Sequence, residues 1–100
     1  MRREGKRIRT PRIEVRYIAS LSRLPRVGII VPRHKQTAVA RNRVKRRLRE
    51  MVRREFLPAM RAFAAVDVVV RAMPEAYAAD AAMLAADLMR AAARMTKAAS

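Results

Sequence analysis

The sequence of 100 residues contains no cysteine and no tryptophan, and its only aromatic residues are 2 Tyr and 2 Phe. Without cysteine the chain can form neither a disulfide nor a zinc–thiolate site, as we expect of a cytoplasmic protein. No apolar run approaches the roughly 18 residues of a membrane span, and the basic N-terminal stretch lacks the apolar segment of a signal peptide. We therefore expect one small domain with an aliphatic core and no membrane partner.

Acidic residues are also scarce. The chain has 24 Lys and Arg against 8 Asp and Glu, a formal net charge of +16. Residues 1–54 carry 19 basic and 3 acidic side chains, whereas residues 55–100 carry 5 of each. Such self-repulsion gives an isolated globule no advantage, so we expect a polyanionic partner. Of the basic residues 20 are Arg, whose planar guanidinium group suits two-point contacts with phosphates.

The first third of the chain predicts two strands. Residues 1–12 are basic and show no apolar period, so they are predicted to form a flexible arm ahead of a single domain over residues 13–97. Residues 13–17 alternate apolar and polar side chains, which predicts a half-buried strand. Residues 26–31 predict a more buried strand that stops at Pro32. The two strands are expected to pair as a hairpin.

The rest of the chain predicts two helices separated by a strand. Thr37 is predicted to cap a long helix that runs to about Phe56 and ends before Pro58. Its apolar face comprises Ala40, Val44, Leu48, Met51 and Val52. The β-branched residues 66–71 predict a third strand, and the Ala-rich residues 75–95 predict a second helix. The order β-β-α-β-α predicts an α+β fold, a small sandwich with helices on one face of a sheet.

The opposite side of the first helix concentrates cationic side chains, as expected for contact with the phosphates of RNA. The predicted RNA-binding residues are Arg41, Asn42, Arg43, Lys45, Arg46, Arg49 and Arg53, and all of them except Arg41 lie on this side or extend it. A solvated basic face on an ordinary helix is the alternative interpretation. Glu50 can pair with Arg46 or Arg54 on adjacent turns, which would neutralise part of the charge.

Residues 41–50, Arg-Asn-Arg-Val-Lys-Arg-Arg-Leu-Arg-Glu, resemble the RNR signature of the bacterial ribonuclease P protein. The strand at residues 26–31 is similar to the strand that leads into this signature in the family. The resemblance implies a protein subunit of an endoribonuclease whose catalytic centre lies in its RNA, with no catalytic residue in the chain. That RNA removes the 5′ leader of precursor tRNA with Mg²⁺ ions held mainly by the RNA. The implied fold includes a left-handed βαβ crossover that contains the signature.

The resemblance also implies a cleft between sheet and helix that receives the 5′ leader. Tyr17 matches an aromatic position on the family's first strand and would line this cleft. Further candidates for the cleft are Arg33, His34 and Lys35. Two departures stand out: the family's N-terminal helix with its phenylalanine-bearing segment is not found ahead of Ile13, and Gln36 replaces a glycine usual in the turn. That turn must therefore form without glycine's freedom at positive φ.

The sequence also fits a small ribosomal or nucleoid protein that would bind RNA or DNA with the same helix and have no part in tRNA processing. A membrane-surface helix fits less well, because Ala40, Val44 and Leu48 are less bulky than typical interfacial residues. An autonomous protein nuclease fits least. His34 has no second ligand or nucleophile beside it, no metal site is predicted, and no carboxylates are paired for acid–base work.

Overall fold

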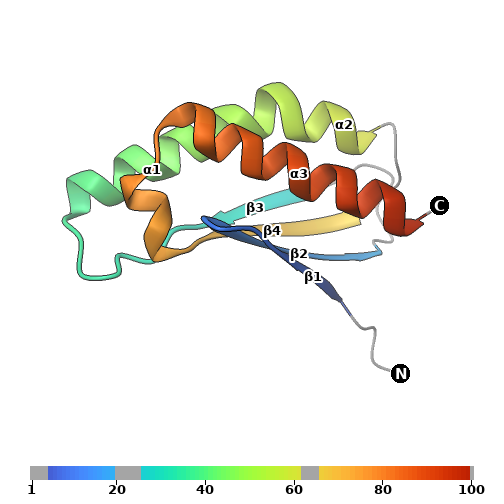
Figure 1. Cartoon of the computed structure of the whole chain (residues 1–100), viewed down its shortest axis with the longest axis horizontal. Coiled ribbons are helices and arrows are strands. Elements are labelled where there is room, and N and C mark those ends of the chain that lie inside the picture. The colour runs from blue at the N-terminus through green and yellow to red at the C-terminus, as the bar shows by residue number, and fades with distance from the viewer. Residues whose placement is uncertain (1–4, 20–25, 62–65, 100) are drawn as a thin grey trace.

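The fold is described by a computed structural model over residues 5–19, 26–61 and 66–99 (Figure 1). In chain order the elements are β1 (Lys6–Arg9), β2 (Ile13–Ala19), β3 (Arg26–Ile30), α1 (Ala38–Met51), the π-helical η1 (Val52–Phe56), α2 (Leu57–Arg61), β4 (Val66–Ala72), the 3-10 helix η2 (Pro74–Ala78) and α3 (Ala81–Ala99). All three predicted strands and both predicted helices are present with shifted ends. The α+β class is therefore confirmed.

The four strands form one sheet in the order β1-β2-β4-β3. β2 runs antiparallel to both of its neighbours, whereas β3 is parallel to β4. Because β4 lies between β2 and β3, the predicted hairpin of residues 13–17 with residues 26–31 is wrong. Parallel strands need a crossover connection, and here α1, η1 and α2 supply it between β3 and β4. The signature helix is thus part of a βαβ unit.

Residues 6–9 form the strand β1, so the prediction of a flexible arm over residues 1–12 is wrong for this part of the segment. β1 pairs with β2, and Ile8 lies opposite Val15 and packs against the core. One apolar residue between charged neighbours gives too short an alternation to recognise as a strand. The hairpin of the sheet is therefore β1–β2.

The turn between β1 and β2 is attached to the last helix. Thr10 is only 5% exposed, and its hydroxyl donates a hydrogen bond to the fully buried carboxylate of Asp87 in α3 (3.1 Å). The backbone N–H and the guanidinium group of Arg12 donate to the same carboxylate at 3.0 and 3.1 Å. A buried carboxylate needs such partners, and residues far apart in the sequence provide them.

α1 and α3 lie side by side over one face of the sheet, and no described element covers the other face (Figure 1). The core between the two layers contains Ile13, Val15, Val44, Leu48, Val52, Phe56, Val68, Val70, Leu84, Leu88 and Met95. Burying each large aliphatic side chain contributes about 1.5–3 kcal/mol. The predicted apolar face of the first helix is confirmed, with Val44, Leu48 and Val52 buried and Ala40 and Met51 half-buried.

The first helical path continues through Pro58, so the prediction that it ends earlier is wrong. In η1 the backbone N–H of Leu57 donates to the carbonyl of Val52, five residues before it. α2 then begins at Leu57, so that Pro58 falls in a first turn, where the missing N–H costs no intrahelical bond. The wider π turn is the local change that lets a helix pass a proline.

α3 begins at Ala81 rather than at residue 75, because Pro74 starts the short helix η2 instead. The carboxylate of Asp80 accepts a hydrogen bond from the backbone N–H of Met83 (2.8 Å) and caps α3. Of the helices in the described ranges, none combines the length and the apolar character that crossing a membrane requires.

Candidate nucleic-acid interface

The signature residues 41–50 lie in α1, whose start and orientation are fixed by a cap and a buried face. The hydroxyl of Thr37 accepts a hydrogen bond from the backbone N–H of Ala40 (3.1 Å), which confirms the predicted cap. Val44 and Leu48 are 2% and 0% exposed, in the core. The helix therefore turns its charged side away from the sheet.

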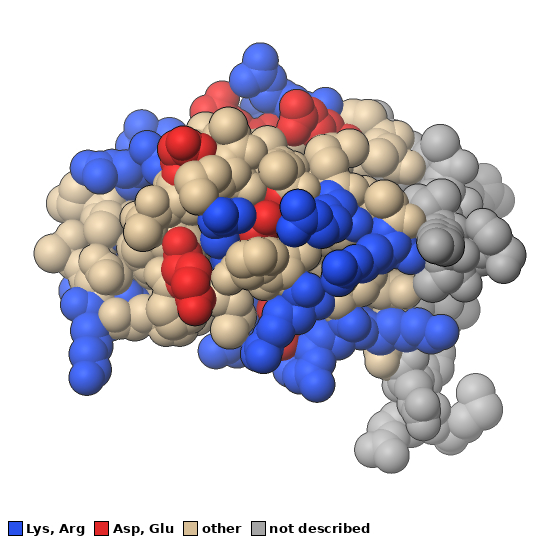
Figure 2. Space-filling model, in the orientation of Figure 1, with Lys and Arg blue, Asp and Glu red and all other residues tan. Residues whose placement is uncertain are grey.

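Exposed side chains on that outward side include Asn42, Arg43, Arg46, Arg49 and Arg53. Within the described residues, none of these arginines forms an ion pair with a carboxylate. The predicted pairing of Glu50 with Arg46 or Arg54 is wrong, since Glu50 has no ion pair in the described ranges. These guanidinium groups are therefore available to acceptors on another molecule. Figure 2 shows Lys and Arg side chains along both the helical and the sheet layers of the molecule.

Two other arginines of α1 are half-buried and anchor the helix. The Nε of Arg41 donates to the backbone carbonyl of Val31 (2.8 Å). The Nη1 of Arg47 donates to the backbone carbonyl of Ala79 (3.2 Å), just after η2. Arg41, predicted as an RNA contact, therefore also holds the segment after β3. Arg47 was not predicted as a site residue, because its partner carbonyl is brought near only by the fold.

A groove of about 300 Å³ runs between α1 and β3, an edge strand of the described sheet. Its cationic wall is Lys45, Arg49 and Arg53, which stand four residues apart and so form one row along the helix. The remaining lining is aliphatic and consists of Val27, Ile29, Val52 and Leu57. Side chains of this kind offer a strip for stacking and aliphatic contact beside a row of positive charge.

The turn into α1 is bent into an unusual backbone conformation. His34 and Lys35 have φ angles of 48° and 66°, and the N–H of Gln36 donates to the carbonyl of Arg33 (2.8 Å). Left-handed backbone costs non-glycine residues free energy, so surrounding contacts must hold it. The turn thus forms without glycine, as expected, and its positive φ angles fall at residues 34 and 35. Gln36, which stands in place of the family's glycine, does not have a positive φ.

Three contacts hold this turn. The Nε2 of His34 lies 3.2 Å from the backbone carbonyl oxygen of Ala72, and its ring meets the ring of Tyr77 edge-on at a centroid distance of 6.2 Å. The hydroxyl of Tyr77 donates to the carbonyl of Pro32 (2.6 Å). His34 is therefore a structural contact of the turn as well as a candidate for the leader cleft.

A second hollow, of about 510 Å³, adjoins the groove at Ile29 and surrounds the end of β3. It brings together Arg33, Arg41 and Arg71, three guanidinium groups from the turn, α1 and β4. The groove and this hollow form one cationic tract from the C-terminal end of α1 to the turn.

Tyr17 is not among the residues that line this tract, and it lies away from the turn. It is opposite Val68 in the β2–β4 register, on the helix-covered face, and packs partly buried against the core. The turn contacts Ala72, which is opposite Ile13. Four residues of strand, roughly 13 Å, separate these two points. The candidates for the leader cleft are thus divided: the turn residues lie together, and Tyr17 lies apart.

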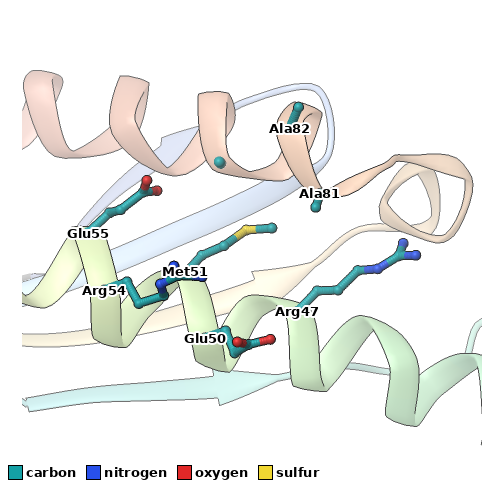
Figure 3. Close-up of a pocket in the computed structure, with 8 residues that line it drawn as sticks. Arg47, Glu50, Met51, Arg54, Glu55, Ala81 and Ala82 are labelled. Atoms are coloured by element: carbon teal, nitrogen blue, oxygen red, sulfur yellow. The ribbon is translucent and has the colours of Figure 1, made fainter.

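A pocket of about 510 Å³ lies on the other side of α1, against α3 (Figure 3). Its lining mixes both charges with small residues and comprises Arg47, Glu50, Met51, Arg54, Glu55, Ala81, Ala82 and Ala85. Figure 3 shows Glu55 pointing toward α3. Because its two arginines are balanced by two glutamates, this pocket attracts phosphates less than the groove beside β3 does.

No group of three or more His, Asp or Glu side chains in the described residues is placed to hold a metal ion. The fold and the cationic tract define a small α+β protein that holds an arginine-rich helix over a four-stranded sheet. The family model described as Ribonuclease P matches residues 1–96, so the chain belongs to the ribonuclease P protein family. The resemblance drawn from residues 26–31 and 41–50 is confirmed.

Curated relatives agree with this assignment. A ribonuclease P protein component of Thermus thermophilus is 48% identical over 66 residues, which are 66% of this chain and 37% of the relative. That of Acidothermus cellulolyticus is 43% identical over 75 residues, 73% of this chain and 58% of the relative. The chain therefore spans between about a third and three-fifths of the length of these relatives.

Solved structures of the same family share the fold. The RNase P protein of Thermotoga maritima superposes with a TM-score of 0.77 at 25% identity, covering 91% of this chain and 84% of that protein. The Staphylococcus aureus RNase P protein gives a TM-score of 0.71 at 21% identity, with 93% and 82% covered. The four-stranded sheet with its helical layer is thus the family's fold.

Proposed function

We propose that the chain is the protein subunit of ribonuclease P, and that it binds the catalytic RNA through the outward side of α1. The observation that carries this proposal is the set of exposed arginines Arg43, Arg46, Arg49 and Arg53, which have no carboxylate partner among the described residues. In the cytoplasm the subunit assists the Mg²⁺-dependent endonucleolytic removal of the 5′ leader from precursor tRNA.

The physical contribution of the protein is electrostatic. Bringing RNA strands together costs phosphate repulsion, and an arginine surface lowers that cost while it releases condensed counterions. The Mg²⁺ ions are held mainly by the RNA, and the protein reduces the concentration needed by supplying fixed positive charge. No residue of this chain takes part in bond cleavage under the proposal.

The groove between α1 and β3 is the proposed site of the single-stranded leader. Lys45, Arg49 and Arg53 supply contacts to successive phosphates, and the aliphatic floor at Val27 and Ile29 accepts unstacked bases. The tract continues to Arg33 beside the strained turn. This assignment moves the leader away from Tyr17, which packs against the core elsewhere.

The test is reconstitution with the ribonuclease P RNA of the same organism at low Mg²⁺, following 5′ maturation of a precursor tRNA with and without the chain. We expect cleavage to accelerate when the chain is added. If about six phosphates are contacted, log K for RNA binding should fall with log salt with a slope of roughly −4 to −5. No acceleration, together with a slope near zero, would reject the proposal. Binding to ribosomes without any effect on cleavage would favour the ribosomal or nucleoid alternative instead.

A further inference from the structure

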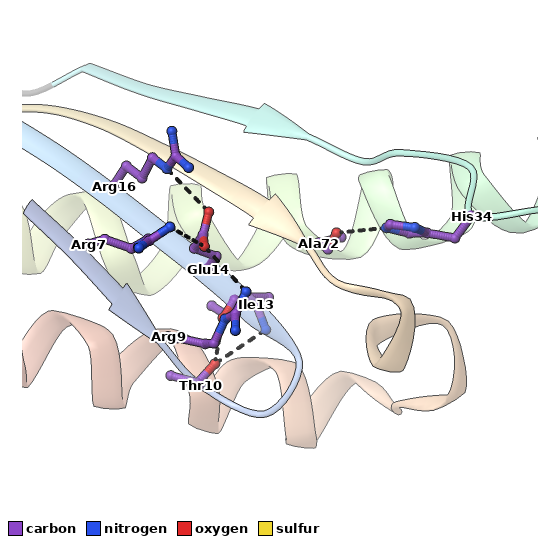
Figure 4. A network of polar contacts seen from close by, with 8 residues as sticks. All are labelled: Arg7, Arg9, Thr10, Ile13, Glu14, Arg16, His34 and Ala72. Carbon is purple, nitrogen blue, oxygen red and sulfur yellow. Dashed lines mark hydrogen bonds and ion pairs between the residues drawn. The ribbon is translucent and has the colours of Figure 1, made fainter. Parts of the chain in front are cut away.

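The two edge strands of the described sheet differ in how their outer edges are protected. β1, at one edge, is four residues long and contains Lys6, Arg7 and Arg9. Its arginines belong to a cluster around the carboxylate of Glu14, to which the Nε of Arg16 in β2 donates a hydrogen bond (3.2 Å). The Nη1 of Arg7 and the Nη2 of Arg9 lie 3.6 and 3.7 Å from the same carboxylate (Figure 4). Short, basic edge strands resist pairing with further strands, so β1 is a poor docking site.

β3, at the opposite edge, has no such protection. Its one charged residue is Arg26, whose Nε and Nη2 donate to the two carboxylate oxygens of Asp67 at 2.9 and 3.0 Å. This hydrogen bonding, with the charge of Asp67, raises the pKa of Arg26. Outside the ladder with β4, the backbone of β3 makes no hydrogen bond to the described residues, and none of them lies within 4 Å of the place that a Cβ would take on Gly28. This edge therefore offers unpaired N–H and C=O groups to a further strand.

The basic row of α1 and η1 lies beside the same edge. Lys45, Arg49 and Arg53 line the groove together with Val27 and Ile29 of β3. Within the described ranges, none of these three cations forms an ion pair with a carboxylate. Four residues of helix advance about 6 Å, and two residues of strand advance about 6.7 Å. A strand added beside β3 would therefore bring every second side chain to the next cation of the row.

We propose that the edge of β3 accepts an extended acidic segment of a partner protein as an added strand. The backbone of the segment pairs with β3, and its carboxylates, at alternate positions, face Lys45, Arg49 and Arg53. The residues between the carboxylates face the other side of the sheet, where Ile30 is 48% exposed. β-branched side chains suit those positions. The partner is thus a segment in which acidic and β-branched residues alternate.

Two other occupants fit this edge less well. A second copy of the chain would bring two basic rows together, each on a chain with a net charge of +16. An RNA strand can bind the row through its phosphates, but it has no amide ladder to pair with β3. An acidic polypeptide matches the row and the edge strand together. Such a segment and the leader exclude each other from the groove, and this consequence alone rests on the proposed function.

Binding of synthetic peptides to the full chain, without RNA, tests the docking site. The probe is a dye-labelled peptide of about nine residues in which glutamate alternates with threonine and valine. Two further peptides keep this sequence and charge, and each has one of the two alternating sets of backbone amides methylated. One set points toward β3 and the other away from it, so fluorescence anisotropy should show that one methylated peptide binds about tenfold more weakly than the other. Equal affinities of the two would overturn the proposal, because charge alone would then be recognised.

Amide hydrogen exchange locates the bound peptide. Exchange at residues 26–30 should slow when the unmethylated peptide binds, because the outward amides of β3 gain acceptors. Exchange at residues 6–9 of β1, the other edge of the described sheet, should stay the same. Slowing at β1 instead of β3, or at neither strand, would overturn the proposal. Slowing at β3 that grows with protein concentration without any peptide would also overturn it, because the occupant would then be a second copy.

A charge-matched pair of variants gives an independent readout. Arg49→Gln removes the middle cation of the row and should weaken binding of the unmethylated peptide by about two- to five-fold. Arg90→Gln, exposed on α3, removes the same charge and should leave the affinity unchanged. Equal losses in both variants would mean attraction to the net charge of the chain and would overturn the proposal. Urea unfolding checks that each variant is folded. Because no RNA is present, failure of the docking site leaves the proposed function standing.

Discussion

The hydroxyl of Tyr77 lies 2.6 Å from the carbonyl oxygen of Pro32 and donates a hydrogen bond to it. The two residues belong to η2 and to the segment between β3 and α1. This bond, with the contact of His34 to Ala72, ties the entrance of the signature helix to the end of β4. The position of α1 over the sheet is therefore fixed at its N-terminal end by residues outside the helix.

Removing that hydroxyl should loosen the turn. Tyr77→Phe keeps the ring contact with His34 and loses the bond to Pro32, so we expect the free energy of unfolding to fall by about 0.5–1.5 kcal/mol. Urea unfolding measures the change. RNA affinity should fall only slightly, because Tyr77 carries no charge. An unfolding free energy equal to that of the parent protein would show that water replaces the bond without cost.

Glycine at the strained turn should stabilise the protein or leave it unchanged. Lys35 has a φ of 66° and makes no side-chain hydrogen bond or ion pair within the described residues, so Lys35→Gly removes roughly 1 kcal/mol of backbone strain. The greater entropy of glycine in the unfolded chain offsets part of this gain. Gln36→Gly is the matched control, because its φ is ordinary and only the entropic cost applies. Thermal unfolding should place Lys35→Gly above Gln36→Gly, and the reverse order would contradict the strain argument.

Two neighbouring arginines of the signature should behave differently. Arg41→Gln loses a hydrogen bond to the carbonyl of Val31, so we expect it to lower stability by about 0.5–1.5 kcal/mol and to weaken RNA binding as well. Arg43→Gln removes an exposed group and should weaken RNA binding alone. Urea unfolding and filter binding on both variants separate the two effects. Equal stabilities would mean that Arg41 has no anchoring role.

Two exposed arginines of α1 should matter only to RNA. Arg43→Ala and Arg46→Ala are expected to weaken RNA binding and to reduce the magnitude of the salt slope by about 0.7 to 0.9 each. The circular dichroism spectrum and unfolding midpoint should stay near those of the parent. Arg90→Ala on α3 serves as the control of equal charge. If both helix variants bind RNA as tightly as the control, α1 is not the binding surface.

Asp87 should be the most sensitive polar residue of the fold. Asp87→Ala leaves the backbone N–H and the guanidinium group of Arg12 without this acceptor, and leaves the hydroxyl of Thr10 with the carbonyl of Ile13 alone. We expect a loss of about 3–5 kcal/mol in unfolding free energy. Arg12→Ala, whose side chain is 24% exposed, should cost less. A double-mutant cycle between the two positions measures their coupling by urea unfolding, and additive effects would contradict a direct interaction.

The parts of the fold that the sequence predicts are those governed by local period. The apolar face of α1 at Val44 and Leu48, its cap at Thr37, and the β-branched residues of β4 all follow from neighbouring residues. The exposed arginines follow from the same helical period. These features can be predicted without knowing which distant residues pack against them.

The parts that the sequence does not predict depend on distant residues. Lys6–Arg9 forms a strand because β2 lies beside it and Asp87 fixes the turn that follows, a partner far along the chain. The place of β4 between β2 and β3 follows from long-range pairing that alternation alone does not specify. The separation of Tyr17 from the turn residues has the same origin. The cluster around Glu14 is not predicted either, because its three arginines come from two strands, one of which lacks a recognisable strand pattern.

The link between Thr10 and Asp87 joins sites separated by 77 positions. During synthesis, the first hairpin therefore has no buried partner for its turn until α3 has left the ribosome, and β3 has no neighbour in the described sheet until β4 has been made. An arginine-rich helix consequently exists on a nascent chain well before the sheet that orients it is complete. Closure of the sheet and of its first turn is thus tied to the synthesis of β4 and α3, and premature contact with RNA is the hazard that such a late-closing fold has to survive.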